Sequence, residues 1–390
     1  MIRLTLIAAL AAGLAAPTQA VPATTGTPDP LAENETCEAS PAALRACYQQ
    51  PPAHWPPPTL AAGIDHWQEL GPLPPVTPPA NAAEESRRAL GRRLFFDPIL
   101  SRSGQIACAS CHHPDQRFAD GRRTSSGHDL KTGHRNSPSL LNTGLHRVWF
   151  WDGRAGSLAA QAMEPMLNPV EMAASREGIE HRLNQDEDYR KAFAEAFGES
   201  PITLEQVAEA LASWQATLRS RSSPFDRFLK GDHRALSDQA ILGLHLFRTK
   251  ARCINCHMGP LLSDDRFHNL GLTYYGGKYE DLGRYQVTRN PDDVGRFRTP
   301  SLREVAATAP YMHNGLFPHL RGVLALYNGG GPRPTPKAHQ ADDPLFPKTS
   351  PILQPLGLTQ RELDALESFL RSLTSGTGER RAVVTQSAGP

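Results

Sequence analysis

The chain has 390 residues, enough for two ordinary domains that each bury a core. It carries 41 lysines and arginines against 40 acidic residues, a formal net charge of +1. No field of one sign therefore favours a nucleic acid or an anionic membrane surface, and we expect neither partner.

Residues 1–20 have the pattern of a signal peptide. A short basic start precedes an apolar run over residues 4–16, and small residues follow around Ala20. The run is shorter than the roughly 20 apolar residues that cross a bilayer, and no later stretch is apolar enough to do so. We therefore expect a protein without a membrane span that is exported to the periplasm.

Residues 21–80 are rich in Pro, Ala and Thr, which predicts an extended arm that is ordered only where it docks. Trp55 and Trp67 are expected to fasten this arm to the body through apolar contacts. The arm also holds Cys37 and Cys47, which in an oxidising compartment most simply form a disulfide.

The rest of the chain predicts helices. The first begins near Asn81 and ends before Asp97, and further amphipathic runs cover residues 179–197 and 203–218. The last covers residues 359–373, where Thr359 and Glu362 form a capping box. No strand-like alternation is long enough to propose a sheet, so the predicted class is all-α.

An internal repeat divides this helical part in two. Residues 90–95 and 242–247 share the pattern Leu-Gly-x-x-Leu-Phe, and each leads into a Cys-x-x-Cys-His motif. Segments with Phe, a polar residue and Gly follow at residues 118–121 and 267–271. We interpret residues 81–230 and 231–376 as two copies of one module, followed by a tail at residues 377–390.

Cys-x-x-Cys-His is the attachment sequence for c-type haem, in which two thiols bind the haem and the histidine binds its iron. The motif is formed by Cys108, Cys111 and His112 and again by Cys253, Cys256 and His257. The alternative is zinc, which would need four ligands at paired spacing, and adjacent Cys and His residues suit that poorly. We expect two cytochrome-c-like domains, each with one covalent haem.

Around these motifs the sequence resembles the bacterial di-haem cytochrome c peroxidases and the related MauG enzymes, over roughly residues 82–375. The segments that carry the resemblance are residues 118–121, 135–142, 150–155, 161–172, 298–303 and 308–315. The resemblance implies that the first domain is peroxidatic and the second is an electron-transfer domain.

The resemblance also implies roles for individual residues. Trp151 lies between the haems and conducts electrons, while Gln161 and Glu171 line the distal pocket of the first haem. The chemistry agrees, because a carboxylate can take a proton from hydrogen peroxide and return it, whereas an amide only donates and accepts hydrogen bonds. The alternatives are interface packing for Trp151 and a solvated or helix-capping acid for Glu171.

A calcium ion between the domains is a further implication of the resemblance. Its ligands would be the side chain of Asn136 and the backbone carbonyls of Thr308 and Pro310, the oxygen donors that calcium prefers. The alternative for Asn136 is a turn residue before Pro138.

Two histidines follow the first haem motif. In the peroxidases a histidine of this loop binds the resting first haem and leaves before peroxide binds, and His128 falls at that position. A histidine on a surface loop is the alternative for His128. We interpret His134 as a loop residue that makes hydrogen bonds.

Two residues are candidates for the distal ligand of the second iron, Tyr327 and Met312. In the resembled family it comes from the helix that follows the His-Asn-Gly motif, where this chain has Tyr327, as the MauG enzymes do. Many peroxidases have Met at this position. A thioether favours ferrous iron, whereas a phenolate favours high oxidation states. We expect Tyr327 to bind the iron, and the alternative is that it only packs.

Two functions remain for an oxidoreductase of the cytochrome-c peroxidase type. One is reduction of hydrogen peroxide with electrons from a small periplasmic cytochrome c or copper protein, which His128 favours. The other is MauG-like oxidation of aromatic side chains in a partner protein, which Tyr327 favours. A di-haem electron carrier is a third hypothesis, but it leaves Gln161 and Glu171 without a function. The sequence leaves the oligomeric state open, a homodimer included.

Overall fold

The computed structural model describes residues 36–376, so the proposed signal peptide and the tail 377–390 lie outside the described residues. The helices are α2 (Pro41–Tyr48), α3 (Ala82–Phe96), α4 (Leu158–Leu167), α5 (Arg176–Gln185), α6 (Glu187–Phe197), α7 (Leu204–Gln215), α8 (Pro224–Leu229), α9 (Asp238–Arg248), α10 (Tyr285–Thr288), α11 (Leu320–Asn328) and α12 (Gln360–Ser372). Long loops and short 3₁₀ turns connect them, and no helix among these described residues is long and apolar enough to cross a membrane.

A two-stranded antiparallel sheet corrects the expectation that the chain has no sheet. Strand β1 (Phe267–Asn269) pairs with β2 (Arg296–Arg298), with Phe267 opposite Arg298. Each strand has only three residues, too few to produce a visible alternation of apolar and polar residues. The fold is otherwise helical.

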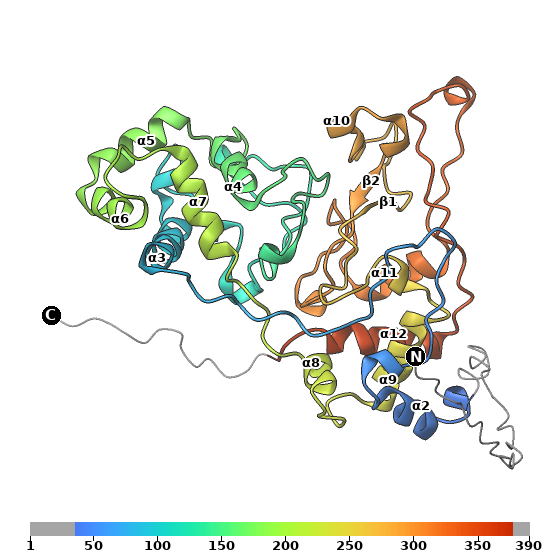
Figure 1. Cartoon of the computed structure of the whole chain (residues 1–390). Coiled ribbons are helices and arrows are strands. Elements are labelled where there is room, and N and C mark those ends of the chain that lie inside the picture. The colour runs from blue at the N-terminus through green and yellow to red at the C-terminus, as the bar shows by residue number, and fades with distance from the viewer. Residues whose placement is uncertain (1–35, 377–390) are drawn as a thin grey trace, which may run out of the picture.

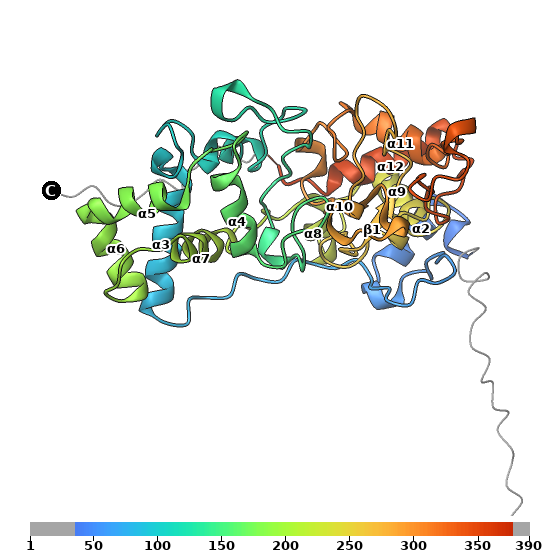
Figure 2. The same ribbon diagram turned by 90° about the horizontal axis from the view of Figure 1, so that it is seen from above.

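Two hydrophobic cores divide the molecule into two lobes, which lie side by side in both views (Figures 1 and 2). The first lobe contains α3 to α7, and its core includes Leu94, Phe95 and Leu211. The second contains α8, α9, α11 and α12, and its core includes Phe247 and Phe369. The short helix α8 therefore joins the second core, although the sequence division assigned its residues to the first module.

Each lobe contains a crossing of two helices with the same geometry, which supports the internal repeat. A Cβ atom on Gly91 of α3 would lie 1.9 Å from the carbonyl oxygen of Ala210 in α7. A Cβ atom on Gly243 of α9 would lie 2.0 Å from the carbonyl oxygen of Ala365 in α12. Only glycine allows backbones to approach so closely, so the repeated Leu-Gly pattern fixes the same crossing twice.

Helix ends follow the capping residues in the sequence. The Asn81 side chain accepts a hydrogen bond from the Glu84 amide at 2.9 Å, and Thr359 and Glu362 form the expected capping box. The apolar run over residues 179–197 is divided into α5 and α6. Asp186 ends one helix and caps the next by accepting from the Tyr189 amide at 3.0 Å.

The arm docks on the second lobe and then crosses to α3 of the first (Figure 1). As expected, Cys37 and Cys47 form a disulfide and Trp55 is buried, whereas Trp67 stays 37% exposed. The guanidinium of Arg248 in α9 is enclosed by the arm. It donates to the Tyr48 hydroxyl at 3.0 Å and to the Pro56 carbonyl at 2.6 Å, and it pairs with Glu69.

The arm also holds the loop of the second Cys-x-x-Cys-His motif. Asn255 stands between the two cysteines of that motif. Its side-chain oxygen accepts from the Ala61 amide at 2.6 Å, and its nitrogen donates to the Thr59 carbonyl at 3.1 Å. The arm is therefore part of the surroundings of the second motif.

Candidate functional site

The first motif opens onto a cavity of about 660 Å³ in the first lobe. Cys108, Cys111 and His112 line this cavity, and both thiols are free of a disulfide. His112 Nδ1 lies 3.0 Å from the carbonyl oxygen of Phe118. A proton on Nδ1 satisfies this contact and leaves Nε2 to bind a metal.

The second motif repeats this arrangement around a cavity of about 230 Å³ in the second lobe. Cys253, Cys256 and His257 line it, and His257 Nδ1 lies 2.9 Å from the carbonyl oxygen of Leu262. Burial lowers the pKa of both His112 and His257, which favours the neutral imidazole that binds metals. Two thiols and one oriented imidazole beside each cavity fit covalent haem.

Hydrogen bonds correct one detail of the repeat. The Ser139 hydroxyl donates to the Arg117 carbonyl at 2.5 Å, and the Ser301 hydroxyl donates to the Leu261 carbonyl at 2.6 Å. Phe118 follows Arg117 and Leu262 follows Leu261, and the carbonyls of Phe118 and Leu262 are the ones that contact the proximal histidines. Phe118 therefore corresponds to Leu262, and not to Phe267 as the spacing of aromatic and glycine residues suggested.

Across the first cavity, α4 and the loop after it contribute Gln161 and Glu171. The Asn168 side chain donates to Glu171 Oε1 at 2.7 Å. Burial raises the pKa of Glu171, although the charge of Arg154 and the hydrogen bond from Asn168 oppose the rise. This carboxyl is therefore placed beside the cavity and is easier to protonate than an exposed glutamate.

Trp151 lies between the two lobes and lines both cavities. Its indole nitrogen donates to the Asn136 carbonyl at 2.9 Å, and its own carbonyl accepts from the Arg298 amide in β2 at 2.8 Å. The side chain is thus fixed from the first lobe and its backbone from the second, so the indole spans the boundary.

The three residues expected to bind calcium, Asn136, Thr308 and Pro310, all line the second cavity. Asn136 Nδ2 donates to the Arg122 carbonyl at 2.9 Å, which leaves the amide oxygen as the end available to a cation. The backbone amide of Asn136 donates to the His313 carbonyl at 2.7 Å, and this hydrogen bond joins the two lobes.

Tyr327 and Met312 both line the second cavity. Burial raises the pKa of the Tyr327 phenol, and the neighbouring Cys256 and Cys253 raise it further. Met312 occupies a turn and has φ of +69°, a left-handed conformation that is uncommon for residues other than glycine.

The repeat gives Tyr327 a counterpart in the first lobe. The turn over residues 311–317 is closed by Tyr311 N donating to Phe317 O at 2.7 Å, and Trp149 N donates to Ala155 O at 3.1 Å in the same way. The helices α4 and α11 begin equally far beyond these turns. Position by position, Tyr327 therefore corresponds to Pro165, which lines the first cavity.

The two loop histidines lie at different depths. His134 lines the first cavity, whereas His128 does not. The Nε2 atom of His128 accepts a hydrogen bond from Arg102 Nε at 2.8 Å, and its backbone amide donates to the Glu171 carbonyl at 2.7 Å. The side chain of His128 is thus held by Arg102 outside the lining of the first cavity.

Arg135 lines the first cavity, although no role was predicted for it from the sequence. Its guanidinium donates to both carboxylate oxygens of Asp281, at 2.7 and 2.8 Å, and to Asp152 at 2.5 Å. Asp281 belongs to the second lobe, so the ion pair bridges the lobes at the cavity. No motif surrounds Asp281, and only the tertiary structure reveals this contact.

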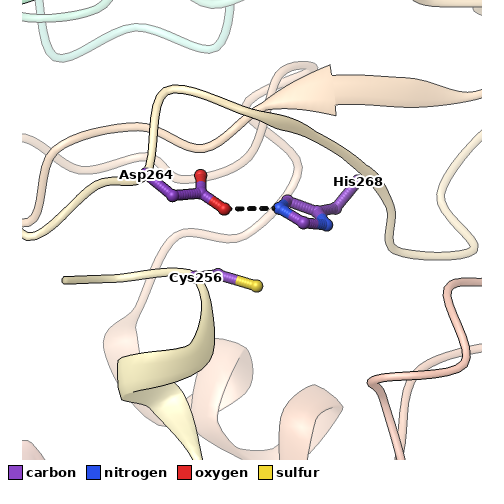
Figure 3. A group of neighbouring side chains, drawn as sticks. All are labelled: Cys256, Asp264 and His268. Carbon is purple, nitrogen blue, oxygen red and sulfur yellow. Dashed lines mark hydrogen bonds and ion pairs between the residues drawn. The ribbon is translucent and has the colours of Figure 1, made fainter. Parts of the chain in front are cut away.

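Cys256, Asp264 and His268 form a cluster of metal-ligating atom types (Figure 3). His268 Nε2 lies 2.7 Å from Asp264 Oδ2; although burial opposes it, hydrogen bonds to Asp264 and Cys256 raise the pKa of His268 to about 10. The first lobe has a comparable loop contact at the matching aspartate, since Ser125 donates to Asp120 Oδ2 at 2.6 Å. The cluster thus belongs to the haem-binding loop, and three donors fall short of a structural zinc site.

Comparisons with known proteins agree with this arrangement. A family model described as di-haem cytochrome c peroxidase matches residues 85–234. The chain is 39% identical over 346 residues to cytochrome-c peroxidase IdrP1 of Denitromonas iodatirespirans, which covers 81% of this chain and 89% of that protein. It is 36% identical over 305 residues to methylamine utilization protein MauG of Methylophilus methylotrophus, which covers 77% of this chain and 85% of that protein.

Among solved structures, a MauG-like protein associated with microbial copper homeostasis matches with a TM-score of 0.67 and 31% sequence identity. The match covers 81% of this chain and 96% of that protein. The chain therefore belongs to the family of di-haem cytochrome c peroxidases and MauG enzymes, and it is an oxidoreductase of the peroxidase type.

Proposed function

We propose that this protein reduces hydrogen peroxide to water at a haem in the first lobe, with electrons that pass through a second haem in the second lobe. Cys108, Cys111 and His112 would hold the first haem, and Cys253, Cys256 and His257 the second. When bound, the haems supply the iron that binds peroxide and the redox capacity for two electrons.

The difference between the two cavities is the observation that carries this proposal. At the same helix position the second cavity receives Tyr327, a side chain with a donor oxygen, while the first receives Pro165, which has none. Only the first cavity has Gln161 and Glu171 in its lining. An iron with an open position does chemistry, whereas an iron with two protein ligands transfers electrons.

The residues of the first cavity can move the protons that the reaction needs. The Gln161 amide can hold peroxide or water by hydrogen bonds without changing its charge. The Glu171 carboxylate can accept a proton from the near oxygen of peroxide and return it to the far oxygen, which leaves as water. Two electrons and two further protons then complete the conversion of one peroxide to two waters.

Trp151 is the proposed route for the electrons. Its indole borders both cavities and is held at the Asn136 carbonyl, so one rigid aromatic ring connects the two haem sites. A calcium ion at Asn136, Thr308 and Pro310 would keep the lobes in register around this ring. The Cys37–Cys47 disulfide supports a place in an oxidising compartment such as the periplasm.

A second function, MauG-like oxidation of aromatic side chains of a partner protein, is favoured by Tyr327. A phenolate ligand lowers the potential of the second haem and makes it a poor acceptor from an ordinary cytochrome. The electron donor would then be the partner protein itself. His128 favours the peroxide reductase, because it stands where a histidine of the peroxidases binds the resting first haem and leaves before peroxide binds. A His128 side chain that lies outside the first cavity is compatible with the activated form.

Two measurements test the proposal. The intact mass of the exported protein should show two haem additions, and one or none would contradict it. Purified protein should then be mixed with hydrogen peroxide, alone and with a reduced small cytochrome. Rapid oxidation of the cytochrome supports the peroxide reductase, whereas a long-lived oxidised spectrum that the cytochrome does not quench supports the MauG-like function.

A further inference from the structure

A buried ion pair links the lobes on the proximal side of the first haem site. Glu304 of the second lobe is fully buried, and its Oε2 lies 3.2 Å from Arg117 Nε of the first lobe. The same oxygen accepts from the Ser375 amide at 3.2 Å, and Arg117 Nη2 donates to the Ser375 carbonyl at 2.8 Å. The segment after α12 therefore closes over the pair.

Arg117 stands next to the carbonyl that orients the proximal histidine. Phe118 follows it, and the Phe118 carbonyl lies 3.0 Å from His112 Nδ1. Both residues have left-handed backbones, with φ of +59° at Arg117 and +55° at Phe118. Such conformations are strained for residues with side chains and persist only where the surroundings hold them. The Leu140 amide also donates to this carbonyl at 3.2 Å, so its position depends both on that contact and on what holds Arg117.

The first lobe shows what Glu304 would do without its charge. Asn142 is the counterpart of Glu304, with φ of +65° against +62°. Its amide donates to the Leu218 carbonyl at 2.9 Å, as the Glu304 amide donates to the Leu373 carbonyl at 3.1 Å. The Asn142 side-chain oxygen accepts from the Ser220 amide at 3.1 Å. A neutral amide therefore suffices for the local contacts, and the charge at Glu304 serves the contact with Arg117.

We propose that Glu304 is a positioning residue for the first haem: its charge holds Arg117, and through Arg117 the carbonyl that orients His112. The inference rests on the proposed function, in which His112 is the proximal ligand. A hydrogen bond to the far nitrogen of a ligating histidine makes that histidine a stronger donor. The second lobe thereby tunes the iron of the first, independently of Trp151.

The substitution Glu304→Gln tests this role, because glutamine keeps the oxygen that accepts from Ser375 and removes the charge. In the reduced protein, the iron–histidine stretching band of the first haem should move to lower frequency, since a weaker hydrogen bond makes His112 a weaker donor. The rate of reaction with peroxide should fall about 10-fold, the lower end of the range for such outer partners. The absorption spectrum of the second haem should not change.

A neighbouring buried ion pair provides the matched control. Asp226 Oδ1 accepts from Arg303 Nη1 at 2.5 Å, both side chains are almost fully buried, and neither contacts the loop of His112. Asp226→Asn should leave the iron–histidine band in place. The double variant Arg117→Gln/Glu304→Gln leaves no lone buried charge, and it should shift the band no further than Glu304→Gln alone.

Two results would overturn the inference: an unchanged band in Glu304→Gln, whatever the double variant shows, or an equal shift in Asp226→Asn. A failure of the proposed function looks different. If the wild-type band persists in His112→Gly, then His112 is not the proximal ligand, and the proposed function falls together with the inference.

Discussion

The two haem-binding lobes share a backbone plan and differ in a few side chains that face the cavities. Both lobes cross two helices at a glycine, hold the proximal histidine by a carbonyl and close a turn before the helix that borders the cavity. On that helix, Pro165 of the first lobe is replaced by Tyr327 in the second. The backbone thus decides where a haem can be held, and under the proposed function the residue at this one position decides whether its iron stays open.

The largest expected effect concerns the open cavity. Glu171→Gln should slow the reaction with peroxide about 10²-fold or more, because an amide cannot accept the proton. In the wild type the rate should rise with pH through the raised pKa of Glu171, since the carboxylate is the reactive form, and the variant should lose this rise. Stopped-flow kinetics measure both.

Glu164→Gln is the matched control for this prediction. Glu164 is a partly exposed carboxylate on α4 that pairs with Arg154 and does not line the cavity. If both variants react with peroxide at the wild-type rate, Glu171 is not the acid–base group and the two cavities differ less than we propose.

The second prediction concerns the closed cavity. Tyr327→Met should raise the midpoint potential of the second haem and introduce the near-infrared band of sulfur ligation, because a thioether favours ferrous iron. Tyr327→Phe should open the second iron and make it resemble the first. Spectroelectrochemistry measures the potential, and a wild-type sulfur band that Met312→Ala abolishes would assign the ligand to Met312 instead.

The third prediction concerns the boundary between the lobes. A stringent chelator should lower peroxide activity and change the haem spectrum, and added calcium should restore both. Asn136→Ala should need about 10-fold more calcium for the same recovery, because one oxygen ligand is lost. Asn184→Ala, on α5 of the first lobe, should recover like the wild type. Normal behaviour of protein shown to be free of calcium would remove calcium from the mechanism.

The smallest effect concerns the arm, which covers only one lobe. Replacing Cys37 and Cys47 by Ala should cost about 2–3 kcal/mol in the stability of the docked arm, as expected for a short disulfide loop. Hydrogen exchange should accelerate in α2 and α9, where Tyr48 meets Arg248, and stay unchanged in α3 to α7. Equal acceleration in both lobes would show that the arm stabilises the whole molecule.

Much of the helical frame was predictable because local signals agree with the packing. Asn81 and Thr359 start their helices where the sequence says so, and the repeated Leu-Gly pattern marks the shared crossing. The break at Asp186 was missed, because the apolar periodicity continues through it. The burial of Arg248 was also missed, since only the docked arm supplies its partners.

The candidate site likewise has residues that could be predicted from the sequence and contacts that could not. The haem motifs and the cavity residues Gln161, Glu171 and Tyr327 were predictable, because each lies in a recognisable segment that the fold brings to a cavity. The contact between Arg117 and Glu304 was not predictable, because it joins distant segments that carry no motif. Contacts between lobes depend on how the domains meet, and a single sequence does not reveal that.

The hydrogen bonds between the arm and Asn255 have a consequence for the synthesis of the chain. Ala61 and Asn255 are 194 positions apart. At a synthesis rate of about 5–20 residues per second, the arm emerges about 10–40 seconds before the loop it will hold. The arm therefore has no loop to hold until residues 253–257 follow it, and these hydrogen bonds form only after most of the chain has been made. The disulfide of α2, by contrast, joins residues only 10 positions apart and does not have to wait for the rest of the chain.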